Sequence, residues 1–516
     1  MEPPNGHVYS SEESIPHTPE KNLPGGGNWV VQKFGGTSVG KFALPIAAIV
    51  KSGLLQSRIA VVCSARSTHD KASGTTNRLL RAAKAAETGV GAKQYAEIVQ
   101  LIEDDHIQAA RDTIKNLDLL DAFIEQVKAE CRSLTKILDS ALHLEEVSKK
   151  AENKIISKGE KLSCHYMAVL LQDNDTPAQV VDLSDIMKRY KIPSLTRDAL
   201  TKDRAYKELA AALGQEVLRC GDRVPIVTGY FGHVPDGLLH SIGRGYTDLC
   251  AALVAIGTHA QELQIWKEVD GIFSADPRKV PTSRLLSSVS PSEAAELTFY
   301  GSEVIHPFTM EQVIRAQIPI RIKNVMNPRG AGTVILPEVE SIQGPLKPKL
   351  SRGPVTIKHS IVVLNIHSNR RTRAHGFLAK IFGILDKHHL SVDLISSSEV
   401  HVSMALHSEH DMLTGGIDDE DIQIQDMRLH GCVEDLSELG NVDLVADMAI
   451  VSLVGKHLKN MTGISGKFFS VLGENHINIE MISQGASEIN ISCVIWQRDA
   501  DRALNVVHTN LFTFLE

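Results

Sequence analysis

The sequence lacks the features of three specialised protein classes. Its 7 cysteines are scattered, odd in number and without a C-x-x-C pair, which argues against a disulfide framework and a zinc knuckle. No apolar run approaches the ~18 residues of a membrane span, and residues 1–28 have no secretory or Arg-rich transit pattern. A net charge of −8 argues against general binding to polyanions such as nucleic acid. We therefore predict a cytoplasmic protein without membrane or nucleic acid partners, with a disordered tail over residues 1–27.

The pattern from Trp29 onward is one of short apolar runs that alternate with amphipathic stretches. Buried strands separated by helices predict a mainly parallel sheet in an α/β layer fold. Residues 76–144 have helical periodicity almost throughout, which suggests helices folded over the sheet. The predicted strands have the sequences WVVQKF, RIAVVCSA, AQVVDL, VPIVTGYF and LQIWKEVD. The 516 residues are enough for about three domains.

Residues 337–354 contain four prolines among turn residues, a composition that ends regular structure. We therefore predict a first domain over residues 28–340 and a linker over residues 341–354.

The last third of the chain contains an internal repeat. GFLAKIFGILDKHHLSVDLIS, from Gly376, aligns without gaps with GISGKFFSVLGENHINIEMIS, from Gly463, which is 463 − 376 = 87 residues later. Each copy lies between two β-rich runs, and a single unit would leave a sheet face or edge uncovered. We therefore predict two small α+β modules, over residues 355–440 and 441–516, that pair within the chain or between subunits.

The stretch VVQKFGGTSVGKF combines a strand with a glycine-rich turn. A strand would deliver Lys33 at its end, Gly35 and Gly36 would allow close approach to an anion, and Thr37 or Ser38 would cap a helix. The same letters spell most of a P-loop, but Phe42 stands where that loop needs a Ser or Thr hydroxyl for magnesium. A plain strand-to-helix turn with a solvated lysine explains the stretch equally well.

Two further stretches have both a structural and a functional explanation. In GRGYTD, Asp248 suits the first turn of a helix, whereas Arg244 between two glycines suits a bidentate anionic partner. In SKGEKLS, Ser157 and Glu160 have the spacing of a capping box, which would be purely structural. The acidic stretch around His106 lacks metal-ligand spacing, and we predict a solvated helix face there.

Five motifs in this order resemble those of the aspartate kinases in the amino-acid kinase superfamily: KFGGTSV, SKGEKLS, GRGYTD, WKEVDGIFSADPR and EAAELTFYGSEVIHP. The pairing of KFGGTSV with a later GRG-x-[ST]-D is highly specific, and the repeat resembles that family's tandem ACT domains. The resemblance extends over nearly all of residues 29–516 and is strongest to the fungal monofunctional enzymes. It implies a three-layer αβα kinase domain with a mainly parallel sheet, followed by two ACT domains of βαββαβ type.

The resemblance implies that the protein transfers a phosphoryl group from ATP to the side chain of L-aspartate, giving 4-phospho-L-aspartate, the first step of threonine and methionine biosynthesis. Since a carboxylate with a pKa near ~3.9 is already ionised at neutral pH, no general base is needed. Mg²⁺ is expected to be held mainly by the nucleotide phosphates, with no metal site made of protein residues alone.

The resemblance also implies individual roles. Lys33 stabilises the transferring phosphoryl group beside Gly35 and Gly36, while Asp248 holds Lys33 or the substrate. Arg244 pairs with the α-carboxylate of aspartate and Glu160 with its α-ammonium group. The remaining expected contacts are Ser64, Thr76 and Thr247 for aspartate, and Lys267, Asp270, Phe273 and Arg278 for adenine and ribose.

The ACT repeats imply a homo-oligomer that is inhibited by L-threonine. In the first copy, residues 373–377 would bind the effector's carboxylate and SVDLISSSE its ammonium group. The expected contacts are Phe377, Val392, Asp393 and Ser397. The second copy has GISGKFF and NIEMISQGASE at the equivalent positions, and its Gln484 and Asn490 make it either a second site or a structural partner. An alternative is that both modules only dimerise.

Two departures from the family pattern limit what can be transferred. Glu303 stands where bacterial members often have lysine before VxHP, and Phe273 stands where many members have tyrosine.

Two other classes of protein compete with this interpretation. A P-loop NTPase would use Asp182 as its acidic magnesium partner, and a catalytically silent amino-acid sensor would need only the repeats. The joint presence of Lys33, Glu160, Arg244 and Asp248 argues against a silent sensor.

Overall fold

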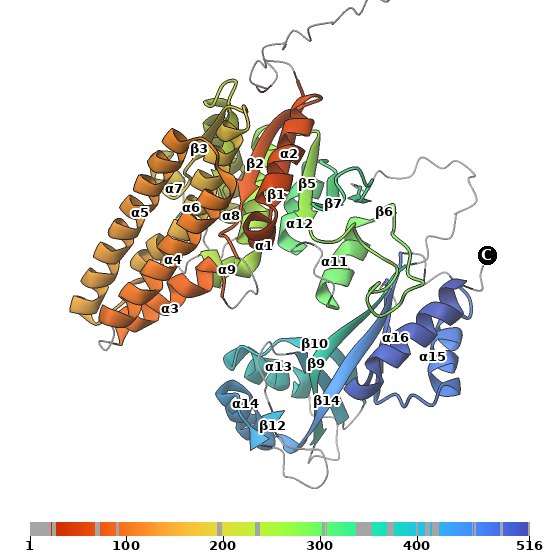
Figure 1. Cartoon of the computed structure of the whole chain (residues 1–516). Coiled ribbons are helices and arrows are strands. Elements are labelled where there is room, and N and C mark those ends of the chain that lie inside the picture. Colours follow the sequence, from red (N-terminus) through yellow and green to blue (C-terminus); the bar gives the residue numbers. More distant parts are fainter. Residues whose placement is uncertain are drawn as a thin grey trace, which may run out of the picture. The chain divides into compact units, whose positions relative to one another are not determined.

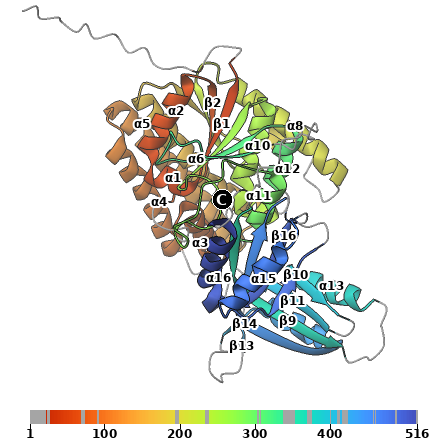
Figure 2. The same ribbon diagram turned by 90° about the vertical axis from the view of Figure 1, so that its right-hand side faces the viewer.

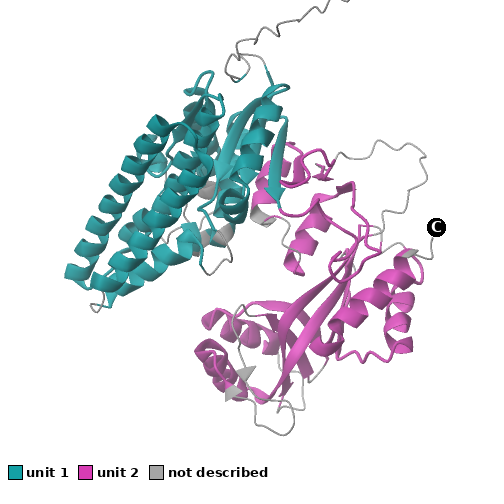
Figure 3. Cartoon of the chain, in the orientation of Figure 1, with its two compact units in different colours: residues 1–267 teal, residues 268–516 magenta. Residues whose placement is uncertain are grey.

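The computed structural model describes residues 22, 27–67, 73–88, 92–192, 199–232, 238–301, 305, 307–336, 353–368, 376–398, 401–407, 413–414, 423–456, 458, 461–485 and 489–513. The chain divides into two compact units, residues 1–267 and residues 268–516 (Figure 3).

Parallel strands form the sheet of the first unit, in the order β3-β4-β2-β1-β5. The strands are β1 (Trp29–Phe34), β2 (Arg58–Cys63), β3 (Ala178–Val181), β4 (Val224–Thr228) and β5 (Glu262–Lys267). Nearly every residue of β1, β2 and β4 is buried, which explains why these strands have continuous apolar sequences. The predicted strands and their parallel arrangement are confirmed. All of them except β1 end before the last residue of the stretch predicted for them.

Helices cover both faces of this sheet, as Figure 2 shows for α2 and α10 on opposite sides of β1 and β2. The predicted helical excursion is confirmed as α3, α4 and α5, which pack on one another and on α6. The helices of this unit are α1 (Gly36–Lys41), α2 (Ala43–Leu54), α3 (Thr75–Glu87), α4 (Ala92–Thr113), α5 (Leu117–Leu144), α6 (Lys149–Asp173), α7 (Ile186–Arg189), α8 (Ala199–Leu218), α9 (Leu238–Ile242) and α10 (Tyr246–Gly257).

One residue of the predicted disordered tail is firmly held. Asn22 is buried, its Oδ1 accepts the Ile59 N–H at 2.9 Å, and its Nδ2 donates to the Arg223 carbonyl at 2.9 Å. The other tail residues, apart from Gly27, lie outside the described part of the chain. All 7 cysteines are buried and free. Of the described helices, none is long and apolar enough to cross a membrane.

A six-stranded antiparallel sheet dominates the second unit, in the order β10-β11-β9-β14-β16-β15. Figure 1 labels its strands β9, β10 and β14. Its strands are β9 (Val355–Ser368), β10 (Val392–Ser397), β11 (His401–His407), β14 (Gly440–Val454), β15 (Met481–Ser483) and β16 (Asn490–Trp496). The long strands β9 and β14, one from each repeat, pair at its centre. The two repeats therefore pair within the chain. The helices that pack on this sheet are α13 (Phe377–Lys387), α14 (Met427–Ser437), α15 (Ile464–Glu474) and α16 (Ala500–His508).

The 87-residue offset of the repeat recurs in the backbone. Three pairs of residues at this offset have a positive φ in both copies, at a strand bulge, at a helix start and after a helix end. The pairs are Ser360 (57°) with Asp447 (54°), Gly376 (81°) with Gly463 (83°), and His389 (54°) with His476 (55°). The sequence repeat is therefore also a structural repeat, which includes its positions of positive φ.

The segment from 268 to 336 belongs to the second unit and packs on the repeats. Ala275 and Val280 share a hydrophobic cluster with Phe468, and Tyr300 packs on the opposite sheet face with Ile361 and Met448. The elements of this segment are β6 (Ser288–Val289), α11 (Pro291–Phe299), α12 (Pro307–Arg315), β7 (Ile320–Asn324) and β8 (Thr333–Ile335). Most of the predicted linker lies outside the described residues, so the domain boundaries stay a prediction.

Candidate active site

The glycine turn after β1 packs closely on the segment after β2. A Cβ atom on Gly36 would lie 2.2 Å from the carbonyl oxygen of Ala65, so only glycine fits there. The Ser67 N–H donates to the Gly36 carbonyl at 3.0 Å, and the Ser64 N–H donates to the Phe34 carbonyl at 3.1 Å. These bonds place Ser64, which is half-buried, beside the turn.

Helix α1 begins differently from the sequence prediction. Gly35 is its N-cap residue, so the expected cap by Thr37 or Ser38 is wrong, because both lie inside the helix. The backbone N–H groups at the start of this turn are therefore not covered by a side-chain cap.

Lys33 and Asp248 form an ion pair. The Nζ atom of Lys33 lies 2.6 Å from Oδ1 of Asp248, and the two side chains are 12% and 13% exposed. Asp248 does lie in the first turn of α10, but its carboxylate reaches across to β1. Helix capping therefore does not explain this residue, and the pair keeps a cation fixed at the end of β1.

Glu160 lies in the middle of α6, so the capping-box interpretation is wrong. Helix α6 is capped by Ser148, whose Oγ accepts the Ala151 N–H at 3.3 Å, while Ser157 donates to the Lys154 carbonyl within the helix. A buried carboxylate in a helix interior needs a partner of its own.

The Glu160 carboxylate is 1% exposed and only partly satisfied. Its Oε1 accepts the Thr247 hydroxyl at 2.9 Å, whereas its Oε2 has no hydrogen-bond partner among the described residues. Burial raises the pKa of Glu160 to about 7, opposed by hydrogen bonds from Thr247, Tyr246 and the Tyr230 backbone and by the charge of Lys33. A positive charge beside the Glu160 carboxylate would lower this pKa again.

Consecutive residues of α10 connect these contacts, because Thr247 binds Glu160 and Asp248 binds Lys33. The structure thus brings four predicted residues together at the end of β1. Thr76 is half-buried as the second residue of α3, and no contact of Thr76 with these four is described. Arg244 lies in the 3₁₀ turn Gly243–Gly245 immediately before α10, and its side chain is outside the described part of the chain.

The predicted nucleotide residues fall in both units. Lys267 is the last residue of β5 in the first unit. In the second unit, Asp270 accepts from the amides of Asn324 and Asn327, each at 3.1 Å. Phe273 makes an isolated β-bridge, and the exposed Arg278 is held by Asp276 at 2.9 Å.

The predicted effector residues are close to a cation of the protein itself. Asp393 lies 2.8 Å from Nζ of Lys358 and its side chain is 5% exposed. The Nζ atom also lies 4.8 Å from the centre of the Phe299 ring, a cation–π contact. Phe377 begins α13, Val392 begins β10 and both are half-buried, whereas Ser397 at the end of β10 is exposed.

The two residues singled out in the second copy have partners within the protein. Asn490 is buried and donates to Glu296 and to the Tyr300 hydroxyl. Gln484 is near the surface and accepts the Ser465 hydroxyl at 2.9 Å. Asn490 therefore joins α11 to the sheet, as a structural partner would.

The solvated helix face predicted around His106 is confirmed in part, since Asp104, Gln108, Arg111 and Asp112 are exposed but His106 is not. His106 is 1% exposed, contacts the Ile102 carbonyl at 2.7 Å, and burial lowers its pKa to about 4. Its neighbour Asp105 pairs with Arg66 at 2.6 Å. One face of this stretch is therefore exposed, whereas His106 faces the interior of the helical layer.

The P-loop alternative fails on geometry. Asp182 pairs with Lys161 at 3.2 Å, and Phe42 ends α1 without supplying a hydroxyl. Glu303 lies outside the described residues. Among those that are described, no group of three or more His, Cys, Asp or Glu could hold a metal ion.

Two tyrosines near Glu160 were not predicted from the sequence. Tyr246 forms a hydrogen bond with Glu160, and the buried Tyr230 hydroxyl has no partner in the described part of the chain. Tyr246 lies inside GRGYTD, so the motif could have indicated it, but Tyr230 lies in an apolar run that carries no such signal.

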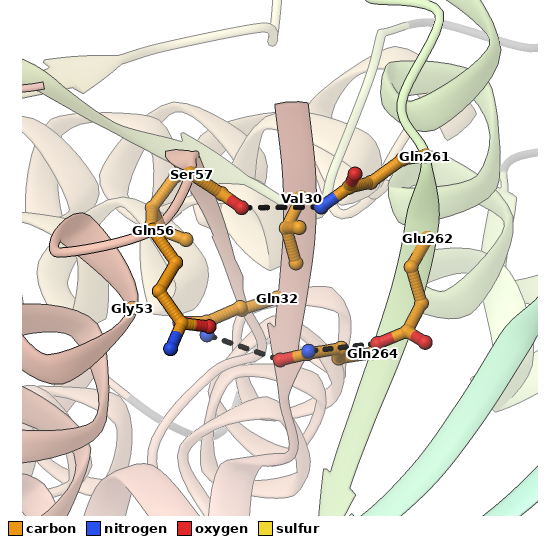
Figure 4. Close-up of a pocket in the computed structure, with 9 residues that line it drawn as sticks. Val30, Gln32, Gly53, Gln56, Ser57, Gln261, Glu262 and Gln264 are labelled. Atoms are coloured by element: carbon orange, nitrogen blue, oxygen red, sulfur yellow. Dashed lines mark hydrogen bonds between the residues drawn. The ribbon is translucent and has the colours of Figure 1, made fainter. Parts of the chain in front are cut away.

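A separate cavity of about 370 Å³ lies on the other face of β1 and β5 (Figure 4). Gln32 lines it and donates to Gln264 at 3.1 Å, with Glu262 and Gln264 from β5 beside it. Side chains alternate along a strand, so Gln32 points away from the face that carries Lys33. No predicted site residue lines this cavity.

Comparisons with known proteins agree with this geometry. A model of the amino acid kinase family matches residues 28–324, and an ACT domain model matches residues 451–511. The aspartokinase of Schizosaccharomyces pombe is 52% identical over 502 residues, which cover 94% of this chain and 92% of that protein. The aspartokinase of Saccharomyces cerevisiae is 48% identical over 510 residues, covering 94% and 93%.

A solved structure has the same fold over almost the whole chain. Escherichia coli aspartokinase III in complex with aspartate and ADP is 28% identical, with a TM-score of 0.70 over 94% of this chain and 99% of that chain. The same enzyme in complex with lysine and aspartate gives a TM-score of 0.70 as well.

Proposed function

Because the chain belongs to the amino acid kinase family, and within it to the aspartokinases, we propose that it transfers the γ-phosphoryl group of ATP to the side-chain carboxylate of L-aspartate. The product is 4-phospho-L-aspartate, the first intermediate of threonine and methionine biosynthesis. The observation that carries the proposal is the assembly of the Lys33–Asp248 pair with the Glu160–Thr247 pair at the end of β1.

For this reaction the protein has to position the two substrates and stabilise the charge of the transition state. An aspartate carboxylate oxygen attacks the γ-phosphorus, the bond from that phosphorus to the β–γ bridging oxygen breaks, and ADP leaves with the electron pair. Since the attacking carboxylate is already ionised, no proton has to be removed. Catalysis then depends on groups that favour the charge distribution of the transition state.

Lys33 is the residue proposed to stabilise the transferring phosphoryl group, with the amides of Gly35 and Gly36 beside it. Asp248 fixes the Lys33 ammonium at 2.6 Å, so the cation is held in place before substrate arrives. A preorganised charge costs no reorganisation at the moment of reaction.

The aspartate zwitterion is proposed to lie between an anion and a cation of the site. The free Oε2 of Glu160 would accept from the α-ammonium group, which would satisfy a buried oxygen and bring the pKa of Glu160 back down. Arg244 is proposed for the α-carboxylate, and Ser64, Thr76 and Thr247 for the rest of the pocket.

The residues proposed to contact ATP are Lys267, Asp270, Phe273 and Arg278. A magnesium ion, when bound, would neutralise phosphate charge and be held mainly by phosphate oxygens. The carboxylates of Asp248 and Asp270 already have protein partners at 2.6 and 3.1 Å. We propose the domain limits predicted above, residues 28–340, 355–440 and 441–516, and a cytoplasmic location.

The regulatory part of the proposal is inhibition by L-threonine in a homo-oligomer. Asp393, with Phe377, Val392 and Ser397 around it, is the proposed site of the effector's ammonium group. Because Lys358 already occupies this carboxylate at 2.8 Å, the effector would have to share or displace that cation. Inhibition from a distant site requires that the effector bind two conformations of the protein with different affinity. An effector that displaces Lys358 would favour the conformation in which this ion pair is broken.

The experiment that tests the activity is hydroxylamine trapping of the acyl phosphate. The purified protein with ATP, Mg²⁺, aspartate and hydroxylamine should form aspartyl hydroxamate, and replacing aspartate by glutamate should abolish it. Threonine, lysine and methionine are then added one at a time. A protein that binds threonine but forms no hydroxamate would be a silent amino-acid sensor, and the proposed activity would be wrong.

A further inference from the structure

The loop of residues 270–278 is built into the hydrophobic core of the second repeat. Ala275 is buried in the same cluster as Phe468 on α15 and Leu504 on α16. The Val355 N–H, at the start of β9, donates to the Ser274 carbonyl at 2.8 Å. These contacts make the backbone conformation of residues 270–278 depend on the repeats. This is the segment to which we assign nucleotide contacts.

A histidine near the chain's carboxyl end holds the centre of this loop. His508, the last residue of α16, is 1% exposed. Its Nε2 lies 2.8 Å from Oγ of Ser274 and its Nδ1 lies 3.4 Å from Oγ1 of Thr282. The ring stacks on Phe512 with 5.2 Å between the ring centres. Both edges and one face of the imidazole are therefore engaged.

The hydrogen bonds around Ser274 leave its hydroxyl proton available for His508. The Arg284 N–H donates to Oγ of Ser274 at 2.9 Å, and the Ser274 N–H donates to the Arg284 carbonyl at 2.9 Å. The remaining hydroxyl proton of Ser274 can then point at Nε2, which requires a neutral His508 with its proton on Nδ1. Burial and the charge of Arg284 lower the pKa of His508, in agreement with a neutral ring at neutral pH.

A second contact also joins α16 to the chain beside this loop. Lys279, just after the loop, lies 2.7 Å from Asp501 on α16, but these side chains are 32% and 65% exposed. Exposed pairs of this kind contribute little. The buried contact of His508 is therefore the stronger connection between α16 and the loop.

We propose that His508 is a positioning residue for ATP binding: through Ser274 it fixes the loop conformation in which Phe273 and its neighbours contact the nucleotide. This rests on the nucleotide role proposed above for residues 270–278. The second repeat thereby supports the nucleotide loop, while the first repeat carries the proposed effector site.

The test removes the same contact from both sides. His508→Ala and Ser274→Ala should each raise the KM for ATP about 3- to 10-fold, the effect of one lost buried hydrogen bond. The KM for aspartate and kcat should stay within about twofold, because neither contact faces aspartate or the phosphoryl group. His508→Gln, which keeps a polar group of similar reach, should restore most of the affinity for ATP.

A matched control is His430→Ala, which removes an exposed histidine of α14 in the first repeat and should leave both KM values unchanged. If His508→Ala lowers the melting temperature strongly, Ser274→Ala decides, since it removes only a hydroxyl. Equal increases in the KM for ATP and for aspartate would indicate a merely structural role and overturn the proposal.

Phe273→Ala distinguishes the role of His508 from the nucleotide role of residues 270–278. If it raises the KM for ATP while both His508→Ala and Ser274→Ala leave it unchanged, His508 is not a positioning residue, although the nucleotide role of the loop stands. If none of the three variants changes the KM for ATP, the nucleotide role of residues 270–278 is wrong, and the role of His508 falls with it.

Discussion

A lysine–aspartate ion pair occurs in each unit, and the two are nearly identical in geometry. Lys33 and Asp248 are 2.6 Å apart with side chains 12% and 13% exposed, whereas Lys358 and Asp393 are 2.8 Å apart with side chains 13% and 5% exposed. Distance and burial therefore do not separate the pair proposed to be catalytic from the pair proposed to be regulatory.

The surroundings of the two pairs do differ. Lys33 is the second-to-last residue of β1, just before a glycine turn, and Asp248 follows Thr247, which binds the buried Glu160. Lys358 lies under the ring of Phe299, so its cation is engaged on two sides. In the mechanism proposed above, the aspartate of the first pair holds the lysine that would face the substrate. In the second pair, the lysine occupies the aspartate proposed to bind the effector.

The largest effect is expected when the first pair loses its cation. Lys33→Met should lower kcat about 10²- to 10³-fold, as the loss of a transition-state contact does. Steady-state kinetics with ATP and aspartate measure it, with Lys358→Met as the matched control of equal chemistry. A kcat within threefold of the parent enzyme would remove Lys33 from the mechanism.

Removing the anion of the first pair should have a smaller effect. Asp248→Asn keeps the shape but frees the Lys33 ammonium, so kcat should fall roughly 10- to 100-fold with little change in the KM for aspartate. A change confined to that KM would instead make Asp248 a substrate contact.

The same change in the second pair should leave catalysis intact. Asp393→Ala should raise the threonine concentration for half-inhibition more than about tenfold, since one charged contact of the effector is lost. Its uninhibited kcat should stay near that of the parent enzyme. Glu480→Ala is the control, because Glu480 is the exposed counterpart in the second repeat, 480 − 393 = 87 residues later. Equal threonine inhibition of both variants would contradict the assignment.

Glu160 offers a buried acid whose charge depends on pH. Burial raises its pKa to about 7, so below that pH the protonated form predominates and cannot attract an ammonium group. The KM for aspartate should therefore increase about tenfold from pH 8 to pH 6, as a single group of pKa near 7 requires. Glu160→Gln should bind aspartate weakly and without this pH dependence. The prediction fails if the parent enzyme has a flat profile.

The smallest effect is expected at the second lysine. Lys358→Met removes the cation that competes for Asp393, so half-inhibition should need roughly two- to fivefold less threonine, the effect of about one competing polar contact. This is opposite in sign to Asp393→Ala. Unchanged or weaker inhibition would mean that Lys358 does not compete with the effector.

The fold was largely predictable because its signals are local. Strands buried on both faces, such as β4, have continuous apolar sequences, and the 87-residue offset places matching glycines before α13 and α15. The motif order then indicated the family, which the comparisons show.

The partners of individual charges were not predictable, since they come from distant parts of the chain. Ser157 and Glu160 have capping-box spacing, yet the residue that caps α6 is Ser148, which lies 157 − 148 = 9 residues earlier. Lys358 of β9 and Asp393 of β10 become neighbours only through the sheet. His106 illustrates the opposite error, because its acidic neighbours suggested solvent although its own side chain faces the core.

The comparison of the two pairs is tested most directly by one measurement on their lysines. Aspartyl hydroxamate formation is followed for the parent enzyme, Lys33→Met and Lys358→Met at saturating ATP and aspartate, without threonine. We expect the Lys33 variant to lose about 10²- to 10³-fold in rate and the Lys358 variant to keep the parent rate within about twofold. Equal loss in both variants, or full activity in the Lys33 variant, would contradict the account.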